Sequence, residues 1–451
     1  MKNRMIRWIS LVLVMLLLVG CTPANPAGQS ETSNTTLNGV DIGKYSIVYS
    51  FEAPDYCKRA AEYIQEQITE RTGVTLPVRE ASSGTFSHAI LVGDTSHELS
   101  QEITPKTNKM EFYLLADENH IAINADYFII AAAAYYFVET YIPGDTFQSV
   151  IPQEVTTATP ITEKANNYIF LIGDGMGFTH TKMFDYMDAP TNVNFYDGED
   201  VFYGYYLPYQ GKIQTDSLSG VTDSAAAGTA LATGYKTSNG RIGRDQDGND
   251  LQSLTELAAS KGMATAVMST DALTGATPSA FYAHAMDRGD SEDITACSEE
   301  KIESGTIITC GLDGDPSYQT KITNTLTELE KSENDFFIMY EEGHIDKHSH
   351  NHDRSNTFRS VVRFNQAIGV FMEYAFYHPD TFVIITADHE TGGLAYDFAE
   401  GLSYTASGHT GADVPIFGYG QGAEAFKNCW LQNNEIPKII ASLWGESNFG
   451  G

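Results

Sequence analysis

The sequence predicts an α/β protein in which a mostly parallel sheet lies between helices, preceded by a smaller α/β domain. From Tyr168 onward, short apolar runs alternate with stretches of helical spacing, which is the pattern of strands buried on both faces of a parallel sheet. A polar segment with two prolines, residues 152–166, separates this region from an earlier one with its own strand and helix signals. The 451 residues suffice for two or three domains, each with its own core.

Composition restricts the possible partners. The chain has 27 basic and 59 acidic residues, with a formal charge of −32. Because nucleic-acid binding requires basic surface, we expect no nucleic-acid partner. The acidic excess is compatible with the binding of cations.

The N-terminus is predicted to be a targeting segment. Three basic residues precede an apolar run that ends in Leu18-Val19-Gly20-Cys21, which resembles a bacterial lipobox. The resemblance implies a signal peptide over residues 1–20, cleavage before Cys21 and lipidation of its sulfur. An ordinary signal peptide or a short membrane anchor is the alternative. We therefore expect an extracytoplasmic protein anchored to the bacterial membrane, with residues 21–38 as a flexible tether.

The four cysteines after Cys21 are Cys57, Cys297, Cys310 and Cys429. Export permits disulfides, and Cys297 and Cys310 flank one acidic segment and could close a small loop. None of the four has Cys-x-x-Cys spacing, which disfavours a zinc site made of thiolates.

Residues 39–151 are predicted to form the small α/β domain. The expected strands and helices, from periodicity and turn signals, are 45–51, 55–71, 88–92, 112–116, 120–124 and 127–142. This order resembles the small N-terminal domain of β-hexosaminidases and related glycosidases. Since no catalytic constellation is present, we expect a structural or interaction role.

Three acidic residues of the second region, Asp174, Glu341 and Asp388, each follow an apolar run directly. The expected strands are 168–172, 264–269, 335–340, 382–386 and 414–418. In an open parallel sheet, the carboxyl ends of the strands meet at the ligand crevice. Three carboxylates gathered there are unfavourable unless cations neutralise them, so the pattern indicates a metal site.

The small-residue stretch 222–234 is expected to begin a helix that carries a reactive serine, Ser224. Free backbone N–H groups and the positive end of the helix dipole would face its oxygen. The alternative is that Thr222 or Ser224 only caps a buried helix.

Further metal ligands are expected at Asp346 and His350, which lie four residues apart and share one face of a helical turn. His409, in a Gly-rich loop, is the natural third ligand. Oxygen and nitrogen ligands without thiolates suit a catalytic zinc with an open position. The neighbouring histidines are alternative ligands or solvated surface, namely His344, His348 and His352.

At this point the chain resembles the alkaline phosphatases. The resemblance covers roughly residues 167–443, and its motifs stand in the family's order: Gly173-Asp174-Gly-Met-Gly177, Thr222-Asp-Ser-Ala-Ala226, Ala276-Thr-Pro278, Ile345-Asp346 with His350, Thr386-Ala-Asp-His-Glu-Thr-Gly-Gly393, and His409-Thr-Gly411. It implies a catalytic domain over residues 167–451 with an alkaline-phosphatase-like fold.

The resemblance also implies roles for individual residues. Ser224 is the nucleophile that becomes phosphorylated, and Arg288 clamps the phosphate. The implied metal ligands are Asp346, His350 and His409 for one zinc, Asp174, Asp388 and His389 for a second zinc, and Asp174, Thr277 and Glu341 for a magnesium. Glu341 is preferred to Glu342 by its spacing from Asp346.

One departure from the family puts the magnesium in doubt. Gly275 stands where the family has Asp or His, and the ammonium of Lys347 is an alternative occupant of that site. We expect hydrolysis of small phosphate monoesters at an open site, because only residues 390–408 separate two of the motifs. The rivals are a phosphodiesterase or sulfatase of the same superfamily, and a surface lipoprotein that binds glycans through its first domain.

Overall fold

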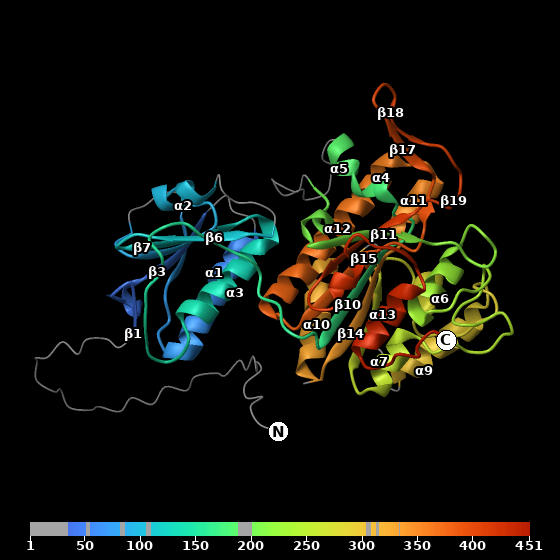
Figure 1. Ribbon diagram of the computed structural model, residues 1–451, viewed down its shortest axis with the longest axis horizontal. Helices are drawn as coiled ribbons and strands as arrows, with labels where there is room; N and C mark the ends of the chain where they lie inside the picture. The colour runs from blue at the N-terminus through green and yellow to red at the C-terminus, as the bar shows by residue number, and fades with distance from the viewer. Residues whose placement is uncertain are drawn as a thin grey trace, which may run out of the picture.

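A computed structural model of the protein describes residues 35–50, 55–81, 86–104, 110–187, 201–303, 308–312, 315–332 and 334–451 (Figure 1). The predicted signal peptide, Cys21 and its predicted lipidation lie outside these residues. Within the described ranges, no helix is long and apolar enough to cross a membrane.

The N-terminal unit is built on a six-stranded sheet. Its strands, in spatial order, are β4 (Val78–Ala81), β3 (Ser46–Ser50), β5 (Ala89–Val92), β7 (His120–Ala125), β6 (Phe112–Ala116) and β9 (Thr156–Ala158). Its helices are α1 (Asp55–Thr72), α2 (Glu98–Ile103) and α3 (Ile130–Tyr141), the last preceded by a short 3-10 turn, η3 (Tyr127–Ile129). The expected strands and helices of this region all form, with ends shifted by one or two residues.

Two short segments join sheets of this unit although the sequence suggests a tether and a linker there. Strand β9 lies inside residues 152–166 and pairs with β6 at the edge of the sheet. Strand β1 (Thr35–Leu37) pairs with β2 (Val40–Asp41) and β8 (Phe147–Ser149) in a separate small sheet. Polar three-residue strands at a sheet edge leave almost no periodic signal in a sequence.

The second unit contains an eight-stranded sheet. Its strands, in spatial order, are β13 (Ile308–Gly311), β12 (Ala264–Ser269), β14 (Phe336–Glu342), β10 (Asn167–Gly173), β15 (Thr381–Thr386), β20 (Val414–Tyr419), β11 (Tyr209–Gln214) and β21 (Trp430–Gln432). The pairings are parallel except for the two that β20 makes, with β15 and with β11. The mostly parallel α/β fold expected from the sequence is confirmed.

Helices cover both faces of this sheet. Helix α12 (Arg354–Tyr377) lies on one face, where its Phe364 stacks on Tyr340 of β14 with the ring centroids 6.2 Å apart. Phe337 of the same strand faces Phe281 on the other side, near α8 (Ala276–Ser279) and α7 (Leu254–Ser260). Alternate residues of a strand point to opposite faces, so β14 is buried on both.

The register of the three central strands brings acidic residues to one edge. Ile172 of β10 is opposite both Glu341 of β14 and Thr386 of β15. Asp174 lies two residues after Ile172, and Asp388 lies two residues after Thr386. Strand β14 runs to Glu342, so Glu341 lies within the strand rather than after it. All three carboxylates are therefore at the carboxyl end of the sheet.

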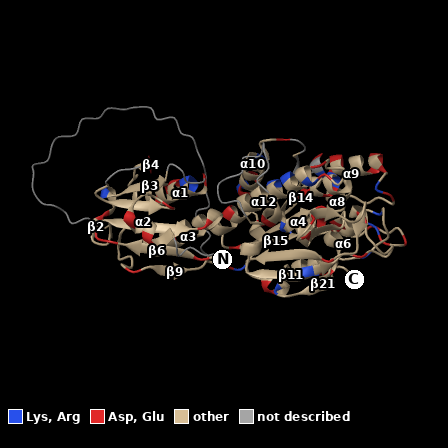
Figure 2. Cartoon of the chain, turned by 90° about the horizontal axis from the view of Figure 1, so that it is seen from above, with Lys and Arg blue, Asp and Glu red and all other residues tan. Residues whose placement is uncertain are grey.

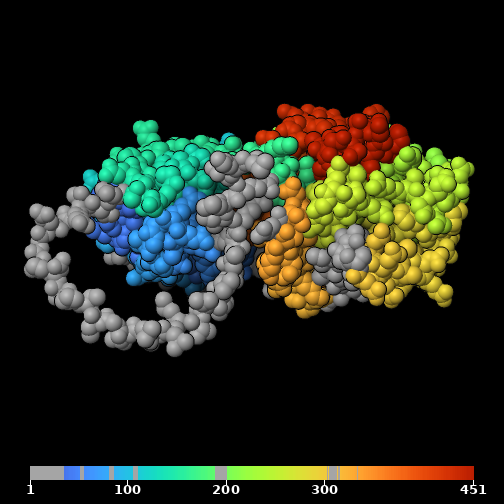
Figure 3. Space-filling model, turned by 90° about the horizontal axis from the view of Figure 1, so that it is seen from below, coloured from blue at the N-terminus to red at the C-terminus, as the bar shows by residue number. Residues whose placement is uncertain are grey.

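Helix α3 and the turn η3 pack on α12 and join the two units, which lie side by side (Figures 1 and 3). Phe128 of η3 stacks on Phe376, with ring centroids 5.8 Å apart. A Cβ on Gly369 would lie 2.5 Å from the hydroxyl of Tyr56, so the close approach of α1 requires a glycine in α12. The first unit is thus attached through the helix that also covers the central sheet.

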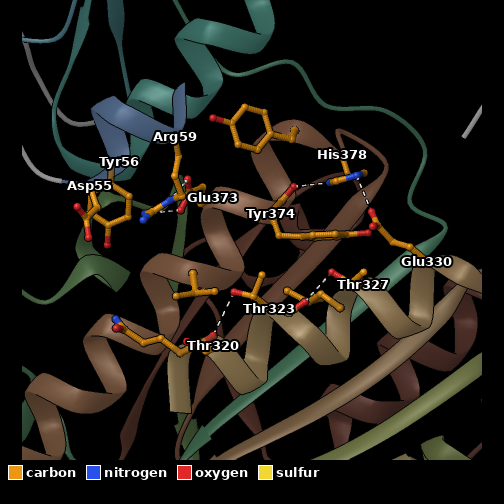
Figure 4. Close-up of a pocket in the computed structure, with 14 residues that line it drawn as sticks. Asp55, Tyr56, Arg59, Thr320, Thr323, Thr327, Glu330, Glu373, Tyr374 and His378 are labelled. Carbon is orange, nitrogen blue, oxygen red and sulfur yellow. Dashed lines mark hydrogen bonds and ion pairs between the residues drawn. The ribbon is translucent and has the colours of Figure 1, made fainter. Parts of the chain in front are cut away.

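A pocket of about 430 Å³ lies at this junction (Figure 4). Arg59 donates two hydrogen bonds to Glu373, and His378 lies 2.8 Å from Glu330. Asp55 also lines the pocket, which is away from the acidic edge of the sheet.

Acidic and basic side chains are interspersed over both units, with more acidic ones (Figure 2). Cys57, Cys297 and Cys429 are free thiols. Cys297 is therefore in no disulfide, and the small loop that it could close with Cys310 is not formed. Cys57 is buried against Gly93, where a Cβ would lie 2.5 Å from its sulfur.

Candidate metal centre

Ser224 is the first residue of α6 (Ser224–Thr233), a ten-residue helix at the carboxyl edge of the sheet. The side chain of Asp223 caps this helix by accepting a hydrogen bond from the backbone N–H of Ala226. The cap is therefore neither Thr222 nor Ser224, and the hydroxyl of Ser224 is left for another use. It is buried, and its Oγ lies 3.3 Å from Nε2 of His389.

A first group of possible metal ligands consists of Asp346, His350 and His409. Asp346 and His350 lie on α11 (His344–His350), and His409 begins β19 (His409–Thr410). From Oδ1 of Asp346, Nε2 of His350 is 3.4 Å away and Nε2 of His409 is 3.5 Å away. The two Nε2 atoms are 3.1 Å apart. The three donor atoms therefore converge on one point.

The imidazole rings of this centre are oriented by oxygen atoms on their far side. Nδ1 of His350 lies 3.1 Å from the carbonyl of Ser407, and Nδ1 of His409 lies 2.8 Å from the carbonyl of Thr222. A carbonyl accepts only, so each Nδ1 carries the proton and donates it. Nε2 is then left with a free lone pair, as metal ligation requires.

A second group of possible ligands consists of Asp174, Asp388 and His389. Nε2 of His389 lies 3.6 Å from Oδ1 of Asp174 and 3.1 Å from Oδ2 of Asp388. Backbone N–H groups of Gly175 and His389 donate to the other oxygen, Oδ1, of Asp388. Gly175 has φ +77°, and a Cβ there would lie 2.8 Å from the Cα of Asp346, so only glycine fits between the two groups.

Burial perturbs the carboxyl groups of this centre. The pKa values of Asp174 and Asp388 are raised by burial first, and then by neighbouring carboxylates. Burial also raises the pKa of Glu341, although the hydroxyl groups of Ser269 and Thr277 act to lower it. Burial lowers the pKa of His389 to about 3. The protein alone thus disfavours the carboxylate charges that this centre must carry, and it keeps His389 neutral, as metal ligation requires.

The donor set fits divalent cations. Oδ1 of Asp174 and Oδ2 of Asp388 are buried and have no hydrogen-bond partner among the described residues. Two lone-pair nitrogens face each other in the first group. Orphaned buried oxygens and opposed acceptors cost free energy that a cation removes. Carboxylate and imidazole donors without thiolates match the ligands of catalytic zinc.

Glu341 and Thr277, the other expected metal ligands, stand beside the two groups. Oε2 of Glu341 accepts a hydrogen bond from Ser269. The Thr277 hydroxyl is buried, and no described atom meets hydrogen-bond geometry with it. Glu342, the residue that spacing did not favour, is fully buried and accepts two hydrogen bonds from Arg363. Its charge is already compensated by the protein.

Arg288 lies beside the serine although it is far from it in sequence. Its Nη1 lies 3.3 Å from Oδ2 of Asp223, the residue that caps α6. That oxygen also accepts a hydrogen bond from the backbone N–H of Gly240. The Arg288 side chain is 43% exposed, so it is held at one end and remains accessible.

The three histidines left open as alternative ligands lie outside both groups. His344 contacts Arg363, His348 faces His344, and His352 stacks on Tyr404. One contributor was missed in the sequence. The hydroxyl of Thr391 donates to Oδ1 of Asp346 and lies 3.2 Å from Nδ1 of His389, so it links the two groups. In the sequence, Thr391 is marked only by its place in the motif that carries His389.

Comparison with known proteins identifies the family. The model of the family described as Alkaline phosphatase matches residues 165–309 and 308–402, which is more than half of the chain. The chain belongs to the alkaline phosphatase family. It is 28% identical to alkaline phosphatase 3 of Bacillus subtilis over 411 residues, covering 62% of this chain and 88% of that protein. It is 35% identical to alkaline phosphatase of Escherichia coli over 170 residues, covering 36% of each chain.

Solved structures agree with this assignment. Alkaline phosphatase from the Antarctic bacterium TAB5 superposes with a TM-score of 0.55 at 26% identity, covering 64% of this chain and 99% of its own. A histidine-to-glutamate variant of the TAB5 enzyme, with magnesium bound in its M3 site, gives a TM-score of 0.56 at the same identity and coverage. The protein is therefore a hydrolase of the alkaline phosphatase superfamily, and its family is metal-dependent and acts on phosphate monoesters.

Proposed function

We propose that this protein hydrolyses phosphate monoesters through a phosphoserine at Ser224, with two zinc ions and one magnesium ion at the centre. The observation that carries the proposal is the position of Ser224. It begins α6, with its Oγ next to His389 of the second ligand group and with Arg288 held beside it by Asp223. A nucleophile, an anion-binding helix end and a guanidinium are thus adjacent.

The residues divide the work as follows. Asp346, His350 and His409 hold one zinc, while Asp174, Asp388 and His389 hold the other. Bound cations supply positive charge that stabilises the oxygens on both sides of an in-line displacement. Magnesium binds at Asp174, Thr277 and Glu341. Thiolates are absent from both groups, as expected for hydrolytic rather than structural zinc.

The covalent steps use the chain's own atoms. Ser224 Oγ forms a bond to phosphorus while the bond from phosphorus to the substrate oxygen breaks. The serine proton passes to solvent, and the departing alkoxide takes a proton from water. Arg288 and the N-terminus of α6 bind the equatorial phosphoryl oxygens during this transfer. Water then attacks the phosphoserine, which releases inorganic phosphate and restores the hydroxyl.

Metal analysis together with rates on three aryl esters tests this proposal. We expect two zinc ions per chain, and turnover of an aryl phosphate monoester far above that of the matching diester and sulfate. Zinc removal by a chelator should abolish the activity, and added zinc should restore it. Faster hydrolysis of the diester or of the sulfate would instead favour a phosphodiesterase or a sulfatase.

We further propose that the mature chain is anchored to the bacterial membrane through a lipid on Cys21, with its enzyme domain outside the cytoplasm. The basis is the sequence Leu18–Cys21, which follows an apolar run. Expression in bacteria fed labelled fatty acid tests it. The label should appear on the wild-type protein and not on Cys21→Ser, and the variant should be released from the membrane fraction.

A further inference from the structure

The third cation site of the proposed enzyme lacks a side chain at position 275, and another residue lies where that side chain would be. A Cβ on Gly275 would be 3.6 Å from Oδ2 of Asp271, four residues earlier in the chain. The same Cβ would lie 2.9 Å from the backbone oxygen of Ala272, which is closer than Cβ atoms come to a carbonyl. A side chain at position 275 would thus clash with the backbone of Ala272 and would be in contact with the carboxylate of Asp271.

We propose that Asp271 supplies the carboxylate that position 275 does not, and that it completes a magnesium site with Glu341 and Thr277. This inference rests on the proposed function. Asp271 follows β12, and its backbone N–H donates to Oγ of Ser269, which in turn donates to Glu341. The backbone of Asp271 is therefore tied through one serine to the predicted ligand Glu341.

The position of Gly343 shows how close the two carboxylates are. A Cβ built on Gly343 would lie 2.8 Å from Cβ of Asp271 and 3.5 Å from Oε2 of Glu341. Both acidic side chains flank the same point, which only a glycine leaves free. The hydroxyl of Thr277, fully buried and without a hydrogen bond among the described residues, is an independent sign of a missing partner. Magnesium prefers such oxygen donors and commonly keeps several waters.

Lys347 has a defined place in this arrangement. Its ammonium forms an ion pair with Oδ1 of Asp271 and is half exposed. It therefore lies on the outer side of Asp271, while Oδ2 points towards position 275. In this geometry Lys347 orients the carboxylate and does not take the place of the cation. The Asp271 side chain is 23% exposed, which leaves room for waters on the cation.

Magnesium titration of the zinc-loaded full chain by calorimetry tests the inference, with Mn²⁺ electron paramagnetic resonance as a second readout. We expect wild type to bind one magnesium beyond its two zinc ions. Asp271→Asn should weaken that binding by about 10–100-fold, the usual cost of losing a supporting carboxylate. Asp247→Asn, an exposed aspartate in a distant turn, is the matched control and should bind as wild type does.

Two results would overturn the inference. One is equal magnesium affinity in Asp271→Asn and wild type. The other is a wild type that binds no magnesium while Lys347→Met does, since the ammonium would then occupy the site. Zinc content and phosphorylation of Ser224 are measured on the same samples. If those fail, the proposed function is wrong, whereas a failure of magnesium binding alone refutes the role of Asp271 and the magnesium of the proposed centre, and leaves the phosphoserine and the two zinc ions standing.

Discussion

The six-stranded and the eight-stranded sheet both place aspartates after parallel strands, and the surroundings of those aspartates differ. In the first sheet, Asp94 follows β5, is exposed, and accepts hydrogen bonds from Gln101 and Thr104. In the second sheet, Asp174 and Asp388 are buried, and each has an oxygen without a hydrogen bond among the described residues. A carboxylate at a strand end thus requires a cation only where the fold withholds both water and donors.

The loops produce this difference. Helix α11, the segment that carries His389 and the start of α6 cover the carboxyl edge of the second sheet and bring imidazoles to it. Over the first sheet, Gln101 of α2 brings an amide and Thr104, just after that helix, brings a hydroxyl, and both donate to Asp94. In the first unit, the aspartate at the end of a parallel strand is therefore an ordinary surface residue.

The largest effect is expected at Ser224. Ser224→Ala removes the oxygen that forms the bond to phosphorus, so turnover should fall by at least about a thousandfold. Acid quench during reaction with labelled substrate should trap phosphate on wild type and not on the variant. Zinc content should be unchanged, since Ser224 belongs to neither ligand group. Equal labelling of both proteins would move the nucleophile elsewhere.

Metal content gives the most direct contrast between the sheets. Asp388→Asn should lower zinc bound per chain, because it removes a charged ligand from the second group. Asp94→Asn, the matched change at the other sheet, should leave it unchanged. After the metal is stripped, the melting temperature of Asp388→Asn should be higher than that of wild type, because the substitution removes a buried charge. Mass spectrometry of bound metal and melting curves with and without chelator measure both effects.

Sequence reasoning recovered most of this contrast because its signals are local. Continuous apolar runs marked the central strands, and the residues that follow them placed Asp174 and Asp388 at one edge. The partners that lie far apart in sequence gave no such signal. In the proposed magnesium site, Asp271 takes the place of a side chain at position 275 because of the path of the chain after β12. The sequence alone does not show that path. The role of Arg288 came only from the resemblance, and its contact with Asp223 was not predicted, because periodicity says nothing about contacts 65 residues apart.

The edge strands were harder for a related reason. β13 and β21 at the two edges, and β11 next to β21, are short or polar, and their place in the sheet depends on pairing with distant strands. Burial patterns that decide a central strand are weak at an edge, where one side faces solvent. Strand β9, at the edge of the six-stranded sheet, was missed for the same reason.

Arg288 should show an intermediate effect. Arg288→Ala removes a bidentate donor for phosphate, so kcat/KM should fall by about 10–100-fold, mostly through KM. Arg288→Lys keeps the charge but not the fork, and should recover only part of the loss. Inhibition by inorganic phosphate should weaken in parallel. Unchanged phosphate inhibition in Arg288→Ala would show that the guanidinium contacts Asp223 only.

The smallest effect concerns a carboxylate that the protein neutralises without a metal. Glu256, at the start of α7, lies 3.1 Å from His284 and 3.3 Å from Lys301. Burial alone would raise its pKa, but the hydrogen bond with His284 and the other partners lower the pKa of Glu256 to about 2. The same hydrogen bond raises the pKa of His284 above its usual 6.5.

The sign of the pH dependence follows from these two shifts. The stability from Glu256 is present above its unfolded pKa of 4.5 and is lost as the pH falls towards 2. The stability from His284 is present below its unfolded pKa of 6.5 and is lost as the pH rises through its raised value. Glu256→Gln should therefore cost about 1–3 kcal/mol of unfolding free energy between these limits, and less on either side. Urea titrations from pH 3 to 8 measure this, and a cost that changes when metal is chelated would contradict the separation of this carboxylate from the metal centre.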